Sequence, residues 1–456
     1  MVVRVSLLGH GFMGRAHAHA LSIAGHFYDV EKPALACVYG RDLPSLVPFA
    51  RRFGFAEETS DLHRAISLAD AVVIALPNSL HSGPAIEALG EGKHVLVEKP
   101  MAATLAEAVA MVDAARGAAK GRVAAVGFNY RFVPAVLRAK ALVPRLGRLY
   151  EFRASYLHQS LSNPQASLGW RGMRELAGLG VLGDLGSHVF DMARFLIGDI
   201  DAVVGLTGRA AKERPGPRGM TPVEVDEAFA SLLRFKNGAY GTVEASKLAL
   251  GRANSLRFEV YGERGSLSFD LERMNELEVV NEDGSKERLL LTDPWSAVSE
   301  GATGVSLPSG KTWPPGHLAG WEDAVVGQDA QFLRAASGQG ELFPAASFED
   351  GLAAQAIAEA VLRSERSGRW EEVEGPRGDW CLLSIRPMQT PNAEDVREET
   401  DASSQALRTS TKTHPEPRWR PCRSHEGPRV RECPWASRVV YIIALNLGFV
   451  MRNLYK

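Results

Sequence analysis

The sequence is poor in cysteine and has no long uninterrupted apolar run. The cysteines are Cys37, Cys381, Cys422 and Cys433. Their spacing is not the paired spacing of metal sites, so we expect neither a disulfide framework nor a zinc centre. The longest apolar stretch near the C-terminus, residues 439–451, is interrupted by Asn446 and Gly448. It is shorter than the about 20 residues that a membrane helix needs. We therefore expect no membrane segment.

An excess of charge of one sign is also missing. The chain has 52 basic and 54 acidic residues, for a formal net charge of -2. This balance gives no electrostatic reason to expect nucleic acid or an anionic membrane as a partner. The N-terminus, MVVRVSLLGHGFMG, has no basic segment before its apolar residues and no cleavage site. It is typical of a first β-strand and not of a signal peptide, so we expect a cytoplasmic protein.

The pattern of the chain predicts three parts. In residues 1–128, short runs rich in Val, Ile and Leu alternate with Ala-rich helical segments, as in a doubly wound parallel α/β sheet. These runs are residues 2–8, 34–39, 71–76, 94–97 and 122–126. In residues 129–373, longer alternating stretches predict an α/β domain with an open, mostly antiparallel sheet. Regular patterning fades in residues 374–456, which we interpret as a disordered extension.

A glycine-rich turn follows the first predicted strand. Gly9, Gly11 and Gly14 form a G-x-G-x-x-G pattern, with Phe12 and Met13 at the start of a helical segment. A dinucleotide site needs this combination, because the backbone must approach a pyrophosphate that binds the free N–H groups of a helix N-terminus. The alternative is a purely structural glycine turn, but the strand–turn–helix context favours the dinucleotide.

The end of the second predicted strand does not settle the cofactor. The residues there are Tyr39, Gly40, Arg41 and Asp42. Arg41 suits the 2′-phosphate of NADP, stacking on adenine, or simple solvation, whereas Asp42 suits the ribose of NAD. Both NAD and NADP stay open at this point.

Two further strand ends carry polar residues. Pro77, Asn78 and His81 follow the strand at 71–76, and Glu98 and Lys99 follow the strand at 94–97. Ligands of open α/β sheets lie outside the carboxyl ends of the strands, so these residues are expected to bind the cofactor. A cationic nicotinamide close to Lys99 would lower the pKa of its ammonium group, which suits proton transfer. The alternatives are a Pro-Asn turn before a helix and a surface lysine on a loop.

A glycine-rich segment, GVLGDLGSHVFD, contains a second polar group. Asp184 and His188 are four residues apart, and Asp191 follows three residues later. On a helix these side chains would share one face, where Asp184 would orient the imidazole and favour its protonated form. Such a histidine can act as a general acid or base. The alternative is a helix with a solvated polar stripe.

Taken together, these motifs resemble one family. GHGFMGRAHAHAL, LPNSLH, VEKP, GFNYRF and GDLGSHVFDM occur in the order and spacing of the Gfo/Idh/MocA oxidoreductases. The resemblance covers about residues 1 to 373 and implies a Rossmann domain, a second α/β domain that mediates oligomerisation, and substrate held between them. A homodimer or homotetramer through the second sheet is thus expected. The family's E-K-P lysine matches Lys99, and its D-x-G-x-H pair matches Asp184 and His188.

The resemblance implies hydride transfer between NAD(P) and a secondary alcohol of a sugar or cyclitol. His188 would exchange the hydroxyl proton, Lys99 would polarise the oxygen or relay the proton, and Asp184 would hold His188 and a substrate hydroxyl. Other expected substrate residues are Tyr130, Arg131, Trp170, Arg171 and His317. The segment WPPGHLAGWED, which includes His317, resembles the levoglucosan dehydrogenase-like subgroup, although core packing explains its tryptophans equally well.

Two other functions occur in the family and stay open. One is a sensor that binds dinucleotide and sugar without turnover, and the other is redox-neutral glycoside cleavage. The family does not explain residues 374–456. From residue 401 on they contain ten Arg or Lys against four Asp or Glu. A basic interaction arm and a non-homologous extension from a shifted reading frame are the two interpretations, and we prefer the second.

Overall fold

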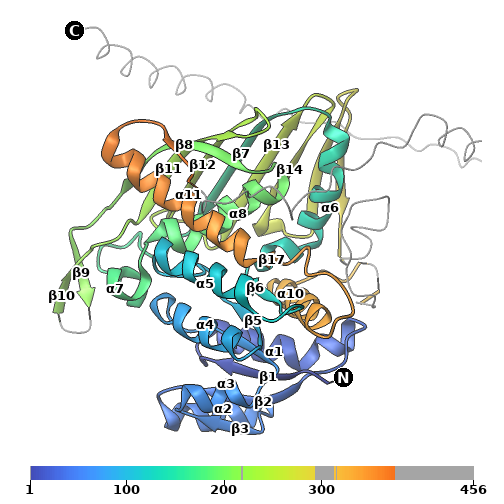
Figure 1. Ribbon diagram of the computed structural model, residues 1–456. Coiled ribbons are helices and arrows are strands. Elements are labelled where there is room, and N and C mark those ends of the chain that lie inside the picture. Colours follow the sequence, from blue (N-terminus) through green and yellow to red (C-terminus); the bar gives the residue numbers. More distant parts are fainter. Residues whose placement is uncertain (1, 217–218, 293–312, 315, 375–456) are drawn as a thin grey trace, which may run out of the picture. The chain divides into compact units, whose positions relative to one another are not determined.

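The computed structural model describes residues 2–216, 219–292, 313–314 and 316–374. Two sheets organise these residues, one of seven strands and one of nine. Figure 1 shows the parallel strands of the first sheet in blue to cyan and most strands of the second sheet in green and yellow. The predicted C-terminal extension and three of the four cysteines lie outside the described residues, while Cys37 is buried. None of the described helices is long and apolar enough to cross a membrane.

The seven-stranded sheet has the order β17-β6-β5-β4-β1-β2-β3. Its parallel strands are β1 (Arg4–Leu8), β2 (Ala34–Tyr39), β3 (Glu57–Thr59), β4 (Ala71–Ile74), β5 (His94–Val97) and β6 (Ala124–Val126). The helices between them are α1 (Phe12–Phe27), α2 (Leu43–Phe53), α3 (Leu62–Ser67), α4 (Ser82–Gly90) and α5 (Leu105–Gly117). Every residue of β4 and β5 is buried, because helices cover both faces. The strand order reverses between β1 and β4, which is where dinucleotides bind in this fold.

Residues from late in the chain complete this first sheet. The short strand β17 (Ala346–Ser347) pairs antiparallel with β6, and helix α10 (Trp321–Ala336) packs against α1. The sequence pattern placed the whole first domain in residues 1–128. The structure shows that its sheet and one of its covering helices also draw on residues 321–347, which follow β16 of the second sheet in the chain.

The nine-stranded sheet has the order β16-β15-β14-β13-β7-β12-β11-β8-β18. Its strands are β7 (Leu149–Leu157), β8 (Ile200–Gly208), β11 (Ala228–Phe235), β12 (Tyr240–Ser246), β13 (Ser255–Gly262), β14 (Gly265–Asp270), β15 (Glu276–Asn281), β16 (Lys286–Leu290) and β18 (Glu371–Glu372). Only β7 and β12 pair in parallel, so the predicted mostly antiparallel sheet is confirmed among the described residues.

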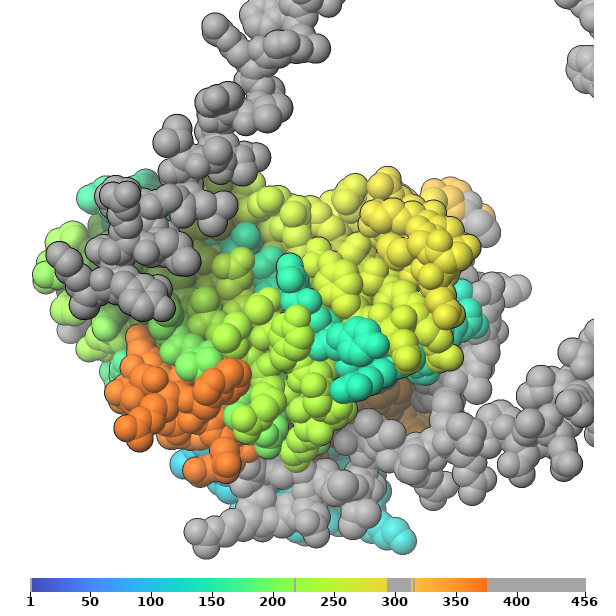
Figure 2. Space-filling view, turned by 90° about the horizontal axis from the view of Figure 1, so that it is seen from above, coloured from blue at the N-terminus to red at the C-terminus, as the bar shows by residue number. Residues whose placement is uncertain are grey.

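Helices cover one face of the second sheet. They are α6 (Pro134–Leu142), α8 (Ser187–Leu196) and α11 (Phe348–Ser367), with the short α7 (Arg174–Ala177) and the hairpin of β9 (Glu213–Gly216) and β10 (Gly219–Pro222) beside them. Burial alternates along β11, because one side chain in two faces these helices. Figure 2 looks onto the opposite face, where the teal residues of β7 lie between green and yellow strands.

Candidate active site

A cleft of about 1120 Å³ lies at the carboxyl ends of the first sheet's strands and continues to the second domain. This exceeds the about 300–1,000 Å³ usual for ligand pockets, so a dinucleotide and a small substrate fit together. Most of the predicted site residues line it. These are Gly9, Gly11, Phe12, Met13, Arg41, Asp42, Pro77, Asn78, Glu98, Lys99, Tyr130, Trp170, Arg171, Asp184 and His188. Four predicted residues, Gly14, His81, Arg131 and His317, do not line the cleft.

The glycine turn after β1 leaves room for a phosphate group. Gly9 has a φ of 104°, and a Cβ there would come within 2.5 Å of the Ala75 carbonyl oxygen. A Cβ on Gly14 would lie 2.1 Å from the Gly9 oxygen, so Gly14 lets the helix pack on the turn. Gly11 instead faces open space at the N-terminus of α1, where no side chain caps the helix. Free N–H groups at an uncapped helix N-terminus fit a pyrophosphate.

The end of β2 places both candidate selectivity residues at the cleft. Arg41 is exposed there. The Asp42 carboxylate accepts a hydrogen bond from the Ser45 hydroxyl at 2.6 Å, and that hydroxyl also lies 2.8 Å from His10 Nε2. The Asp42 carboxylate is therefore held at the rim of the cleft, in the position where an acid suits the ribose of NAD.

His81 is a structural residue, which corrects its predicted role in cofactor binding. Its side chain is fully buried, and its ring nitrogens lie 3.0 Å from the Pro100 carbonyl oxygen and 2.8 Å from that of Leu76. It thus joins the loops after β4 and β5. Asn78, by contrast, lines the cleft and donates to the Ala177 carbonyl oxygen at 3.0 Å, which ties the loop after β4 to α7.

At the centre of the cleft, two lysines bind one carboxylate. Lys99, before a cis peptide bond to Pro100, donates to the backbone oxygen of Asp184 at 2.9 Å and to Oδ1 at 3.0 Å. Lys247 contacts Oδ2 of the same carboxylate at 2.7 Å. Burial alone would raise the pKa of Asp184, but the charges of Lys247 and Lys99 outweigh it and hold this pKa well below its usual range. Asp184 is therefore a fixed anion.

His188 is buried among aromatic rings, and its surroundings favour the neutral imidazole. Burial, and then the charge of Lys99, hold its pKa well below the usual value. Its ring packs against Tyr130 at a centroid distance of 4.7 Å. Asp184 lies in a π-helical turn, Leu182–Gly186, before α8. Among the described residues no hydrogen bond joins its carboxylate to His188, and this carboxylate binds Lys99 and Lys247 instead. The predicted protonated, Asp184-oriented histidine is thus wrong.

Glu98 belongs to a buried chain of charges beneath the cleft. His17 on α1 donates to Glu98 Oε1 at 3.1 Å and to Asp329 Oδ2 at 2.9 Å. Burial opposes a charged imidazole, but the two carboxylates outweigh burial and raise the pKa of His17 to about 10. The second Glu98 oxygen accepts the Lys99 backbone N–H at 3.2 Å. Both oxygens are thus fixed. Neither His17 nor Asp329 is predicted from the sequence as a member of this chain of charges, because they lie 312 positions apart.

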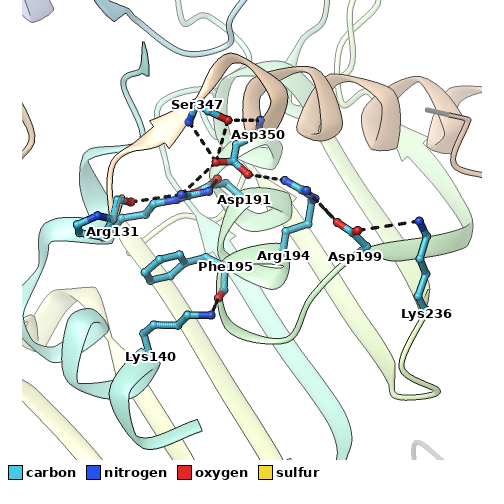
Figure 3. A network of polar contacts seen from close by, with 10 residues as sticks. Arg131, Lys140, Asp191, Arg194, Phe195, Asp199, Lys236, Ser347 and Asp350 are labelled. Carbon is cyan, nitrogen blue, oxygen red and sulfur yellow. Dashed lines mark hydrogen bonds and ion pairs between the residues drawn. The ribbon is translucent and has the colours of Figure 1, made fainter. Parts of the chain in front are cut away.

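Arg131 is also structural and not a substrate residue. Figure 3 shows its guanidinium between two carboxylates under α11. It pairs with Asp191 at 2.5 Å and with Asp350 at 3.3 Å, and only 3% of its side chain is exposed. Arg194 binds the other oxygen of Asp350 at 2.9 Å. This network joins α8 to α11 behind the cleft.

Of the remaining predicted substrate residues, Trp170 and Arg171 lie at the cleft and His317 does not. The guanidinium of Arg171 stacks on Trp170 at 4.4 Å, and its Nε lies 3.6 Å from Asp184 Oδ1. His317 is exposed and bonded to the Pro314 carbonyl oxygen at 2.8 Å, outside the cleft. From the same segment Trp321 does reach the cleft, where it stacks on Phe12 at 5.4 Å.

Comparison with known proteins supports this two-domain arrangement. Residues 3–128 match the profile described as the oxidoreductase family with an NAD-binding Rossmann fold, and residues 136–268 match the GFO/IDH/MocA C-terminal domain. Levoglucosan dehydrogenase of Pseudarthrobacter phenanthrenivorans is 37% identical over 81% of this chain and 98% of its own. Glucose-6-phosphate 3-dehydrogenase of Bacillus subtilis is 25% identical over 80% of this chain and 97% of its own.

Solved structures give the same result. A levoglucosan dehydrogenase in complex with NADH superposes with a TM-score of 0.76 at 34% identity, covering 82% of this chain and all of the other. A complex of levoglucosan dehydrogenase with NADH and levoglucosan matches equally well, with a TM-score of 0.76.

Proposed function

The chain belongs to the Gfo/Idh/MocA family of oxidoreductases, and we propose that it oxidises a secondary alcohol of a sugar, with an anhydrosugar such as levoglucosan as the first candidate and NAD as the hydride acceptor. One observation carries the proposal. The cleft joins an uncapped helix N-terminus that fits a pyrophosphate to a neutral histidine beside two lysines and a carboxylate. The first part suits a dinucleotide, and the second suits a polyol that loses a proton.

The residues of the cleft divide the chemistry between them. Bound NAD would supply the hydride acceptor. His188 is neutral and therefore able to take the proton of the substrate hydroxyl as a general base. Lys99 has an N–H that is not used by Asp184 and donates it to the same oxygen, which stabilises the developing negative charge. Asp184 holds Lys99 in place and accepts a hydrogen bond from a second substrate hydroxyl.

The choice of NAD over NADP rests on the rim of the cleft. Asp42 is anchored by Ser45 with its carboxylate at the cleft, where a negative charge disfavours a 2′-phosphate. Arg41 at the same rim would favour the phosphate, so the two residues compete. The family profile and the NADH complexes of similar structures add weight to NAD.

We further propose that two copies associate through the outer face of the nine-stranded sheet. Figure 2 shows this face, and its residues surround a shallow depression of about 670 Å³ on β7, β8, β11, β12 and β13. Leu206 and Leu232 are exposed on it by 61% and 47%. Exposed apolar side chains that gather on one face are typical of an interface. Light scattering of the purified protein tests this association.

The experiment that tests the function is absorbance in the reduced-nicotinamide band. Purified protein is mixed with NAD or NADP and with anhydrosugars, aldoses or inositols. A rise with NAD and one sugar is the expected result. Cofactor binding without a rise would favour a sensor, whereas release of a leaving group without net reduction would favour glycoside cleavage. Either outcome would contradict the proposed dehydrogenase.

A further inference from the structure

Lys247 lies in the substrate half of the cleft, although no sequence motif marks it. It follows β12 directly and lines the cleft. Its backbone N–H donates to the Glu227 oxygen at 3.0 Å, and its own carbonyl oxygen accepts from Leu161 N–H at 2.9 Å. These bonds fix its backbone from both sides. Its ammonium group contacts Asp184 Oδ2 at 2.7 Å, with 11% of the side chain exposed.

A buried ion pair holds the residues of the cleft that surround Lys247. Arg214 is fully buried and pairs with Glu227, which is 1% exposed. The same guanidinium donates to the carbonyl oxygens of Asn163 at 2.7 Å and Leu161 at 2.8 Å. Arg214 on β9 thus anchors both Leu161 and Glu227, the two residues that bond to the Lys247 backbone, so the position of Lys247 is built into the fold.

The hydrogen bonds of the two lysines differ. An ammonium group has three N–H donors. Lys99 uses two of them on Asp184, whereas the only described acceptor of Lys247 is one Asp184 oxygen. Two Lys247 donors are thus left at the cleft among the described residues. Because each lysine contacts a different oxygen of one carboxylate, their ammonium groups are neighbours, which suits two neighbouring oxygens of one ligand.

We propose that Lys247 is a specificity-determining residue that donates a hydrogen bond to the hydroxyl next to the reacting one, so that the enzyme selects vicinal diols over isolated secondary alcohols. This inference rests on the proposed function, in which Lys99 binds the reacting oxygen. Asp184 accepts the hydrogen bond that this second hydroxyl donates. A ligand without the second hydroxyl leaves a charged donor unpaired in the cleft, which is a strong basis for rejection.

The test is a thermodynamic cycle in which one change is made in the protein and the other in the ligand. Levoglucosan and its derivatives with one ring hydroxyl at a time replaced by hydrogen are compared with the unchanged protein and with Lys247→Met. With the unchanged protein, we expect kcat/KM for one derivative to be roughly 10- to 100-fold lower than for levoglucosan. With Lys247→Met, we expect kcat/KM for the same derivative to be almost the same as for levoglucosan. Lys247→Arg, which retains a charged donor, should restore part of this discrimination.

Control measurements separate this inference from the proposed function. Lys286→Met removes a lysine that pairs with Glu278 on the exposed surface and should leave the discrimination intact. The same cycle is also measured as dissociation constants with NADH bound, so that it does not depend on turnover. Absence of turnover with the unchanged protein contradicts the proposed function. Equal penalties in the unchanged protein and Lys247→Met, in both readouts, would overturn the role of Lys247 and leave it a counter-ion of Asp184.

Discussion

Lys99 binds Asp184 at two atoms, the backbone oxygen at 2.9 Å and the carboxylate Oδ1 at 3.0 Å, across 85 positions of the sequence. The bond joins the end of a strand in the first domain to the π-helical turn of the second. It therefore places the proposed proton-handling groups of both domains at one point. The geometry of the reaction depends on how the two domains meet.

Removal of His188 or Lys99 should abolish turnover and spare cofactor binding. His188→Ala removes the proposed base and Lys99→Ala removes the donor to the reacting oxygen, so we expect kcat to fall by roughly 10²- to 10⁴-fold. NADH affinity, measured by fluorescence titration, should stay within a few-fold of the original. Normal turnover in either variant would refute its assigned role.

The pH profile should reflect a histidine that is harder to protonate than usual. Burial and the charge of Lys99 lower the pKa of His188 below 6.5, so the neutral base persists as pH falls through 6.5. We expect kcat/KM to stay level through that pH and to decline only at lower pH. An acid limb at or above 6.5, in a kinetic profile or an NMR titration of this ring, would contradict this assignment.

Gly11 should be needed for the cofactor and not for the fold. A methyl group at Gly11 meets no protein atom within 4 Å, yet it projects into the space proposed for the pyrophosphate. Gly11→Ala should therefore leave the thermal midpoint nearly unchanged and weaken NADH binding at least tenfold. Gly83→Ala, in the first turn of α4, where a methyl group also meets no atom within 4 Å, is the control outside the cleft and should change neither.

Arg131→Met should destabilise the protein and leave substrate recognition alone. The substitution leaves the buried Asp191 without its partner and weakens the support of Asp350, so we expect a loss of about 3–5 kcal/mol in the free energy of unfolding. Arg234→Met, which breaks an exposed pair with Asp201, should cost about 0–1 kcal/mol. Denaturant unfolding gives both values. A selective rise in KM without destabilisation would restore Arg131 to the substrate site.

Alkaline pH should lower the free energy of unfolding, because His17 loses its proton. Its pKa is raised from 6.5 to about 10, so the folded state holds a proton that the unfolded state releases. The stabilisation is complete below pH 6.5 and is lost as pH rises toward about 10, by up to about 1.4 kcal/mol per pH unit. Thermal midpoints across this range should fall more steeply for the original protein than for His17→Asn. Parallel curves would contradict a charged His17.

The sequence predicted the two-domain fold and the parts of the site that obey local rules. Gly9, Asn78 and Lys99 follow parallel strands, and the carboxyl ends of parallel strands meet at one edge. Their place at the cleft followed from this rule. The antiparallel second sheet was visible as alternating residues, of which the burial pattern of β11 is an example.

The sequence did not correctly predict the roles of residues whose partners are distant in the chain or lie in another element. Arg131 is withdrawn from the cleft by Asp350, which lies 219 positions later. The carboxylate of Asp184, which was the predicted partner of His188, instead binds Lys99 and Lys247 from other elements. Lys247 stands in no motif, and its role depends on a carboxylate from another element. Such pairings are set by tertiary packing, which the local pattern does not encode.

The late return of β17 and α10 to the first sheet bears on synthesis at the ribosome. While the chain emerges in order, β6 remains an edge strand with unpaired backbone groups until residue 346 appears. His17 likewise meets Asp329 only after strands β7 to β16 of the second sheet have been made. The nucleotide-binding half therefore cannot be completed before strands β7 to β16 of the second sheet have been made, and a nascent chain that stops before residue 329 has neither a covered sheet edge nor the Asp329 partner of His17.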